Sequence, residues 1–183
     1  MFSDARSKSI ILVAHCILNQ NSISDGTATA PGSIKEIMEL LGKSDVGVLQ
    51  MPCPELMCLG LDRGNILGGS YPVVEENTRI RKMLSQKPAT RIIGKLIQDL
   101  IFQILEYRKY NFHLRGVVGV NRSPSCGVNT TSANNKEVEG EGVFIRALRH
   151  ELNRKSIKIK FVGIKPFETD QALTAIKGLV GMD

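Results

Sequence analysis

Cysteine is the residue type in this sequence with the most distinctive chemistry. The 183 residues include four cysteines, at positions 16, 53, 58 and 126. Four are too few for a disulfide-rich scaffold, and a chain of this length can bury a core without one. They are enough for a site that binds soft metals, because thiolates favour zinc, copper(I) and iron–sulfur clusters. Their positions relative to the predicted strands therefore decide what they can do together.

Three of the cysteines follow predicted strands. Cys16 comes directly after the first strand, Cys53 two residues after the second, and Cys126 six residues after the third. In a parallel sheet the carboxyl ends of the strands lie along one edge, and ligands bind in the crevice outside that edge. We therefore expect these cysteines to share a site. Cys58 forms only a C-x4-C pair with Cys53, and its role as fourth ligand, pocket residue or packing residue stays open.

The elements that must position these residues alternate along the chain. Buried strands are predicted at 9–15, 46–51, 116–120 and 157–164, the first three almost continuously apolar, which is typical of a parallel sheet covered on both faces. Helices are predicted at 34–41, with Ser33 as N-cap and Gly42 as its end, and at 77–85, 89–110, 142–153 and 169–180. This alternation predicts an α/β three-layer sandwich with a mostly parallel, Rossmann- or flavodoxin-like sheet of about four strands. If the strand order is 2-1-3-4, the switch point lies between the first and third strands, beside Cys16 and Cys126.

Composition limits the class of protein. Hydrophobic residues make up 42% and charged residues 23% of the chain, which is globular composition and excludes disordered and collagen-like proteins. The formal charge of +6 is compatible with an anionic partner. We expect one domain over residues 1–183, no membrane-spanning helix, no secretory leader and a cytoplasmic location, where cysteines are thiols or metal ligands. The oligomeric state is not predictable from these features.

Spacing favours a cluster over a structural zinc ion. Structural zinc sites usually take ligands in C-x2-C pairs, which this sequence lacks. An iron–sulfur cluster accepts ligands from separated loops, and three cysteines on a four-iron cluster would leave one iron open. Glu55 lies two residues from Cys53, where a carboxylate can move protons. Ser123 and Ser125 place two hydroxyl groups beside Cys126.

These motifs resemble those of the 2-thiouracil desulfurase family. Residues 16–26 are similar to the family's C-L-L-G-x-x-x-R-Y-D-G stretch, with the Cys, Leu, Asp and Gly in register. The family's C-P-E matches residues 53–55, and Gly60, Leu61 and Arg63 look like its G-L-x-x-P-R. Its S-P-S-C-G matches 123–127 without a change, and its G-x-G-V matches 140–143. The chain departs from the pattern at Asn19, Ile23 and Ser24, and residues 77–110 do not align. It resembles a divergent member.

The resemblance implies both a cofactor and a reaction. It implies a [4Fe-4S] cluster held by Cys16, Cys53 and Cys126, whose open iron takes sulfur from a thiolated pyrimidine and releases it as sulfide. The substrate would be a free base, a nucleoside or a thiolated nucleotide in tRNA. Glu55 would act in acid/base catalysis, and Ser123 would position or protonate the substrate. We further expect substrate contacts from Asp25, Ser125 and Cys58.

Two other functions are compatible with the residues. If all four cysteines were ligands, the chain would be a non-catalytic iron–sulfur, metal-binding or electron-transfer protein. A cysteine nucleophile activated by His15 is less favoured, because on a strand His15 would point to the face opposite Cys16. A basic stretch at 146–160 favours a nucleic-acid substrate only slightly, because basic side chains on an exposed helix need no partner.

Overall fold

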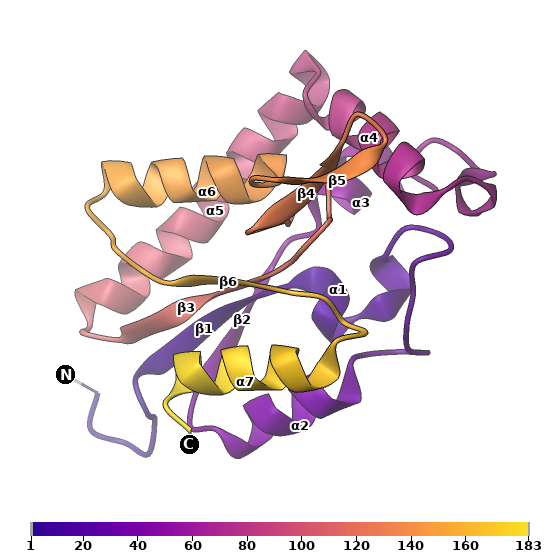
Figure 1. Ribbon diagram of the computed structural model, residues 1–183. Helices are drawn as coiled ribbons and strands as arrows, with labels where there is room; N and C mark the ends of the chain where they lie inside the picture. Colours follow the sequence, from indigo (N-terminus) through magenta and orange to yellow (C-terminus); the bar gives the residue numbers. More distant parts are fainter. Residues whose placement is uncertain (1, 183) are drawn as a thin grey trace.

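A parallel four-stranded sheet forms the centre of the computed structural model, which describes residues 2–182 (Figure 1). The strands β1 (Ser9–Ala14), β2 (Gly47–Met51), β3 (His113–Val120) and β6 (Phe161–Ile164) lie in the order β2-β1-β3-β6. Every neighbouring pair in this sheet is parallel. The predicted parallel sheet is therefore confirmed, its strand order is the 2-1-3-4 arrangement considered from the sequence, and all four carboxyl ends lie at one edge.

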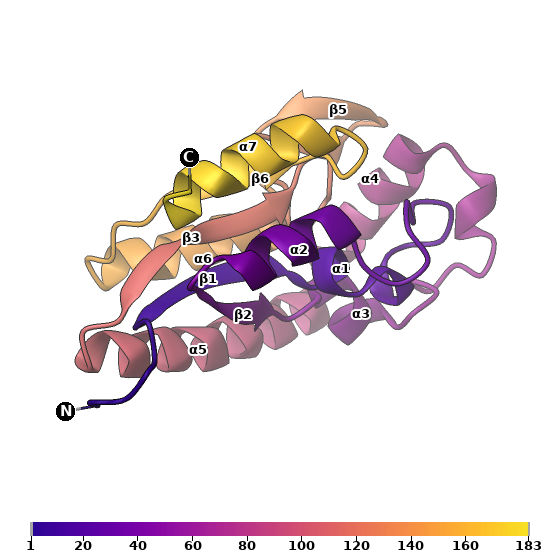
Figure 2. The same cartoon turned by 90° about the horizontal axis from the view of Figure 1, so that it is seen from below.

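Helices cover both faces of the sheet, as expected for a three-layer sandwich. Figures 1 and 2 show α2 (Lys35–Lys43) and α7 (Thr169–Val180) on one face, and α5 (Lys87–Lys109) and α6 (Val143–Arg154) on the other. Strand β1 is buried along its whole length between these layers. The expectation that β2 would be equally buried is wrong, because β2 lies at the edge of the sheet and Val48 is 41% exposed.

Two predicted helices differ from the observed ones at their ends. Ile34, not Ser33, occupies the N-cap position of α2, without a side-chain cap, and the helix runs through Gly42 to Lys43. Helix α4 (Val73–Leu84) begins four residues before the predicted start, directly after Pro72. A proline cannot continue a helix from the preceding turn but is tolerated at its start. The short elements α1 (His15–Leu18), η1 (Gln20–Ser22), α3 (Pro54–Leu59) and η2 (Gly68–Ser70) occupy segments expected to be irregular.

A hairpin occupies part of the third segment that was expected to be irregular. Strands β4 (Thr130–Ala133) and β5 (Lys136–Glu139) pair in antiparallel fashion. Asn134 and Asn135 form the turn with φ values of 53° and 58°. Asparagine tolerates this left-handed backbone, which two-residue hairpin turns need. The hairpin packs against α4, and Figure 1 shows both beyond the carboxyl edge of the sheet, away from the chain ends.

Within residues 2–182, we find no helix whose length and apolar character would let it cross a membrane.

Candidate functional site

A pocket opens at the carboxyl edge of the sheet, and three cysteines line it. Cys16 lies in α1, just after β1, and Cys53 is the N-cap residue of α3, just after β2. Cys126 lies in the loop between β3 and β4 and is 7% exposed. Segments that are far apart in the sequence thus bring three thiols to the crevice where α/β proteins bind ligands.

Burial raises the pKa values of all three thiols. Burial, reinforced by the nearby Cys53 and Glu55, raises the pKa of Cys16 to about 12. Burial and Glu55 raise the pKa of Cys53 to about 11. Burial raises the pKa of Cys126 well above its usual value, and Cys16 and Cys53 raise it further. The three sulfur atoms therefore lie within electrostatic reach of one another, in a setting where thiolates need a compensating positive charge.

The donor set is more suitable for a cluster than for one ion. Within the described residues, no group of three or more His, Cys, Asp or Glu side chains forms a site for a metal ion. A four-iron cluster spreads its ligands more widely, because each thiolate binds a different iron. The buried thiol of Cys126 and the half-buried thiols of Cys16 and Cys53 come from three separate segments around one pocket and fit this requirement.

A buried carboxylate lies in the wall of the pocket beside the thiols. Glu55, in the first turn of α3, is 7% exposed. Its Oε1 accepts hydrogen bonds from the hydroxyls of Ser125, at 2.5 Å, and Ser123, at 3.4 Å. Its Oε2 accepts from the Ser24 hydroxyl at 3.1 Å and from Nε of Arg63 at 3.3 Å. The carboxylate thus connects directly to three hydroxyl groups that can carry a proton.

Arg63 compensates the charge of this carboxylate. It is 2% exposed and adopts a left-handed backbone conformation, with φ of 56°. Its guanidinium also donates to the carbonyls of Ser22, Gly60 and Leu61, and its Nη2 lies 3.8 Å from the Cys53 sulfur. Arg63 therefore ties the loop after Cys16 to the loop after α3 and places positive charge beside one thiol.

Hydrogen bonds within the loop that carries Cys126, and others from the start of α6, hold this loop in place. The Ser123 hydroxyl accepts from the backbone amides of Ser125, at 3.2 Å, and Cys126, at 3.0 Å. From outside, the first amides of α6 donate to loop carbonyls: Gly142 to Gly127, Val143 to Pro124, and Phe144 to Ser125, each at 3.0 Å. A Cβ atom at Gly142 would collide with the Ser125 carbonyl, so glycine permits this close approach.

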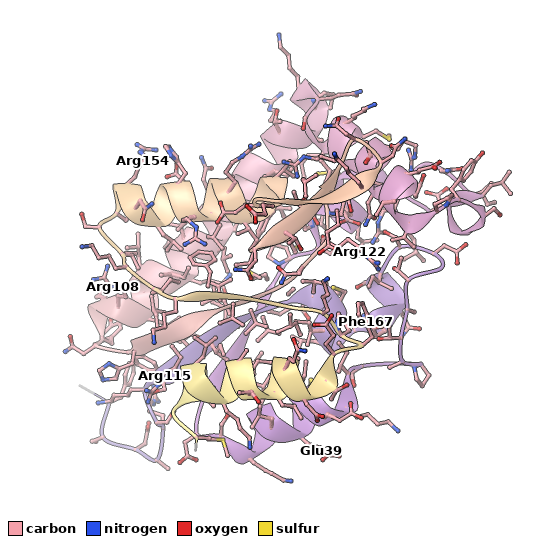
Figure 3. The ribbon with its side chains drawn as sticks, viewed as in Figure 1. Glu39, Arg108, Arg115, Arg122, Arg154 and Phe167 are labelled. Atoms are coloured by element: carbon pink, nitrogen blue, oxygen red, sulfur yellow. The ribbon has the colours of Figure 1, made fainter. Side chains whose placement is uncertain are left out.

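An aromatic ring and a cation lie at the mouth of the pocket. Phe167 follows β6 and is 59% exposed, and Arg122 follows β3. The Arg122 guanidinium carbon lies 6.0 Å from the Phe167 ring centroid, and Figure 3 shows both residues in the same part of the molecule. This pair could contact the face of a planar ligand that enters the pocket.

Comparison with known proteins reveals a relationship over most of the chain. No protein-family model matches the sequence, and no solved structure matches it. The "Uncharacterized protein MJ0003" of Methanocaldococcus jannaschii is 31% identical over 162 residues, which cover 86% of this chain and 94% of the relative. The chain belongs to the same family as this archaeal protein.

Two of the expected substrate-binding residues lie elsewhere. Cys58 is on the part of α3 that packs against α5, and its sulfur donates to the Ala89 carbonyl at 3.6 Å. Asp25 is exposed and lines a smaller hollow with Gly68 and Gly69. The pocket with the three thiols does contain Glu55, Ser123 and Ser125, as expected.

The pocket also contains residues that sequence analysis did not assign to it. His15 was expected on a strand, facing away, but β1 ends at Ala14, and His15 begins α1 and lines the pocket. Burial lowers the pKa of His15, and the charge of Arg63 lowers it further. Ser24, Asn77 and Phe167 also line the pocket. Of these, only Phe167 carries a usable sequence signal, since it follows the fourth strand as the cysteines follow the others.

Proposed function

We propose that this protein is an iron–sulfur-dependent desulfurase that removes sulfur from a thiolated pyrimidine and releases it as sulfide. The observation that carries the proposal is the presence of three thiols, Glu55 and Ser123 in one pocket. The overall reaction is redox-neutral: water and the thiocarbonyl compound give the carbonyl compound and hydrogen sulfide. The resemblance of residues 53–55 and 123–127 to the thiouracil desulfurase motifs supports the same reaction.

In this proposal Cys16, Cys53 and Cys126 hold a [4Fe-4S] cluster. Once bound, the cluster would supply an iron without a protein ligand, and such an iron is a Lewis acid for sulfur. Cys58 does not line the thiol pocket and its sulfur donates to the Ala89 carbonyl, which supports an iron left open in this proposal. Arg63 offsets part of the negative charge at Cys53.

Proton transfer would fall to Glu55 and its hydroxyl partners. The reaction takes a proton from water and delivers a proton to the departing sulfur. Glu55 is bonded to Ser123 and Ser125, which lie beside Cys126, so a proton can pass between the carboxylate and the pocket through a hydroxyl. Positioned general acid/base groups of this kind contribute about 10²–10⁴-fold to rate. Ser123 would also orient the substrate.

The substrate would be a free base, a nucleoside or a nucleotide of tRNA, and the setting a reducing cytoplasm. The four free thiols suit such a compartment. Phe167 and Arg122 at the mouth suit a planar ring with a polar or anionic substituent. A non-catalytic iron–sulfur or electron-transfer protein is the alternative, but it requires Cys58 as a ligand, and the position of Cys58 on α3 does not favour this.

The cofactor is tested by anaerobic purification and reconstitution, followed by iron and sulfide analysis. We expect about four irons per chain, retained in Cys58→Ala and lost in Cys16→Ala. Cys58→Ala and Cys16→Ala both remove one thiol, so the pair is a matched comparison. Zinc alone, or no metal, in the reconstituted protein would contradict the proposal. Equal loss of iron in both variants would favour the non-catalytic alternative.

The proton-transfer role is tested by Glu55→Gln in the reconstituted protein. We expect the variant to keep its iron and its visible absorption but to release sulfide from 2-thiouracil at least about 100-fold more slowly. Glu75→Gln, at an exposed position on α4, is the control and should be as active as the parent. Unchanged turnover in Glu55→Gln would exclude this role.

A further inference from the structure

Asn77 is a buried polar residue in the pocket with no role in the reaction as proposed above. It lies on α4, is 7% exposed, and lines the thiol pocket as well as the smaller hollow beside it. It belongs to a segment outside all the motifs that resemble the desulfurase family. Its amide must therefore be understood from its own contacts.

The orientation of the Asn77 amide is fixed by its nitrogen. Nδ2 donates to the carbonyl of Arg122 at 3.4 Å and to the hydroxyl of Ser132 at 3.3 Å. That hydroxyl gives its own proton to the same Arg122 carbonyl at 2.7 Å. If the amide were rotated by 180°, Oδ1 would face the Arg122 carbonyl, which can only accept. It would also face the Ser132 hydroxyl, whose proton is already donated to that carbonyl. The oxygen therefore points away from the hairpin.

Solvent reaches this oxygen. Among residues 2–182, no hydrogen bond is formed to Oδ1 of Asn77, yet no fully buried side-chain nitrogen or oxygen lacks a partner. Oδ1 must therefore be accessible, although the residue as a whole is buried. A fixed, accessible acceptor in the wall of a pocket is a recognition group for a ligand N–H.

We propose that Asn77 determines specificity by accepting a hydrogen bond from the ring N3–H of the substrate pyrimidine. This inference rests on the proposed function. N3 adjoins both C2 and C4, so its N–H lies next to the reacting carbon whichever of the two carries sulfur. It also remains free when N1 bears ribose, so the same contact serves a free base and a nucleotide. A ring alkylated at N3 would leave the Asn77 oxygen unpaired.

Binding of two isomeric product analogues tests this contact without turnover. 1-Methyluracil and 3-methyluracil have the same size and differ only in which N–H is blocked. We expect the reconstituted parent protein, studied by calorimetry, to bind 1-methyluracil about 10-fold more tightly, because 3-methyluracil leaves a buried acceptor without a donor. In Asn77→Ala the two affinities should become equal within about twofold.

A further variant separates recognition from a structural role of Asn77. Ser132→Ala removes a partner of Nδ2 and leaves Oδ1 in place, so it should retain the preference for 1-methyluracil. A purely structural role would weaken both ligands equally in Asn77→Ala. A preference that persists in that variant, or a parent protein that binds both isomers equally, would overturn the inference.

Sulfide release from 2-thiouracil, measured on the same preparations, distinguishes failure of this inference from failure of the proposed function. Sulfide release together with isomer affinities that do not depend on Asn77 would overturn the specificity role and leave the desulfurase proposal standing. Isomer discrimination that depends on Asn77, without sulfide release, would refute the desulfurase activity and support a pocket that only binds the ring.

Discussion

Arg63 and Glu55 form a buried ion pair in the wall of the pocket. Their side chains are 2% and 9% exposed, and their charged atoms lie 3.3 Å apart. Burying two charges is costly, and the pair is tolerated because hydroxyl and carbonyl groups satisfy the remaining donors and acceptors. Removing one partner leaves the other charge buried without compensation, which is more harmful than the pair's own net contribution suggests.

We therefore expect Arg63→Ala to lower the free energy of unfolding by about 3–5 kcal/mol. Urea denaturation of the metal-free protein measures this change. The control is Lys109→Ala, which breaks the exposed pair between Lys109 and Glu106 and should cost less than about 0.5 kcal/mol. An Arg63→Ala variant as stable as the control would show that the buried pair is not needed to hold the pocket.

Some residues of the pocket could be predicted from the sequence, and others could not. The three pocket cysteines could be placed because the carboxyl ends of parallel strands meet at one edge. Arg63 could not, because an exposed loop and a buried left-handed turn look alike in sequence. Asn77 was equally hidden, because its hydrogen bonds to Arg122 and Ser132 depend on the contact of α4 with the hairpin.

Among the elements, α6 has the most direct effect on the site. Its first amides hold the carbonyls of the loop that carries Cys126, and Gly142 lets the helix approach that loop closely. A helix has unpaired amides at its first turn, and here the loop supplies the acceptors. The position of Cys126 is thus set by a helix that begins 17 residues later in the chain.

Gly142→Ala should displace this loop. The added methyl group would collide with the Ser125 carbonyl, and overpacking of this kind typically costs about 1–3 kcal/mol. We expect the variant to unfold at lower urea concentration and to retain less iron after reconstitution. Gly94→Ala is the control, because Gly94 is exposed on α5 with open space around it and should gain about 0.5–1 kcal/mol. Full iron retention in Gly142→Ala would contradict the proposed coupling of α6 to the Cys126 loop.

The hairpin of β4 and β5 was not predicted from the sequence. Its strands are short and polar, and Thr130, Thr131 and Ser132 lack the apolar alternation that marks a half-buried strand. Their side chains instead bond to neighbouring loops, as Thr131 does to the Ser123 carbonyl and Ser132 to Arg122. The Asn134–Asn135 pair was the available signal, since adjacent residues that tolerate positive φ favour a two-residue turn.

Over the whole molecule, polar contacts attach the parts beyond the sheet edge to one another. Glu76 on α4 accepts from Arg79 at 2.6 Å and from Asn65 at 3.1 Å, which joins the helix to the loop before it. Glu137 on β5 accepts from Thr130 at 2.6 Å and from Lys165 at 3.3 Å, which joins the hairpin to the segment after β6. Both carboxylates therefore link segments that surround the pocket.

These contacts make stability depend on pH in a definite direction. Hydrogen bonds from Arg79, and to a lesser extent from Asn65, hold the pKa of Glu76 below its ordinary value of 4.5. The Thr130 hydroxyl, followed by Lys165, does the same for the pKa of Glu137. In acid the unfolded chain takes up protons first at these positions, so protonation favours unfolding. The stabilisation is complete above about pH 6 and is lost as pH falls through the two folded-state pKa values.

We therefore expect the double variant Glu76→Gln/Glu137→Gln to be less stable than the parent at neutral pH. The difference should shrink steadily below about pH 4.5, because the parent's carboxylates then become neutral as well. Urea denaturation of the metal-free protein between about pH 3 and pH 7 measures this convergence. Glu39→Gln, at an exposed position on α2, should follow the parent at every pH. Curves of parent and double variant that stay parallel down to the lowest pH would show that these two carboxylates do not govern acid stability.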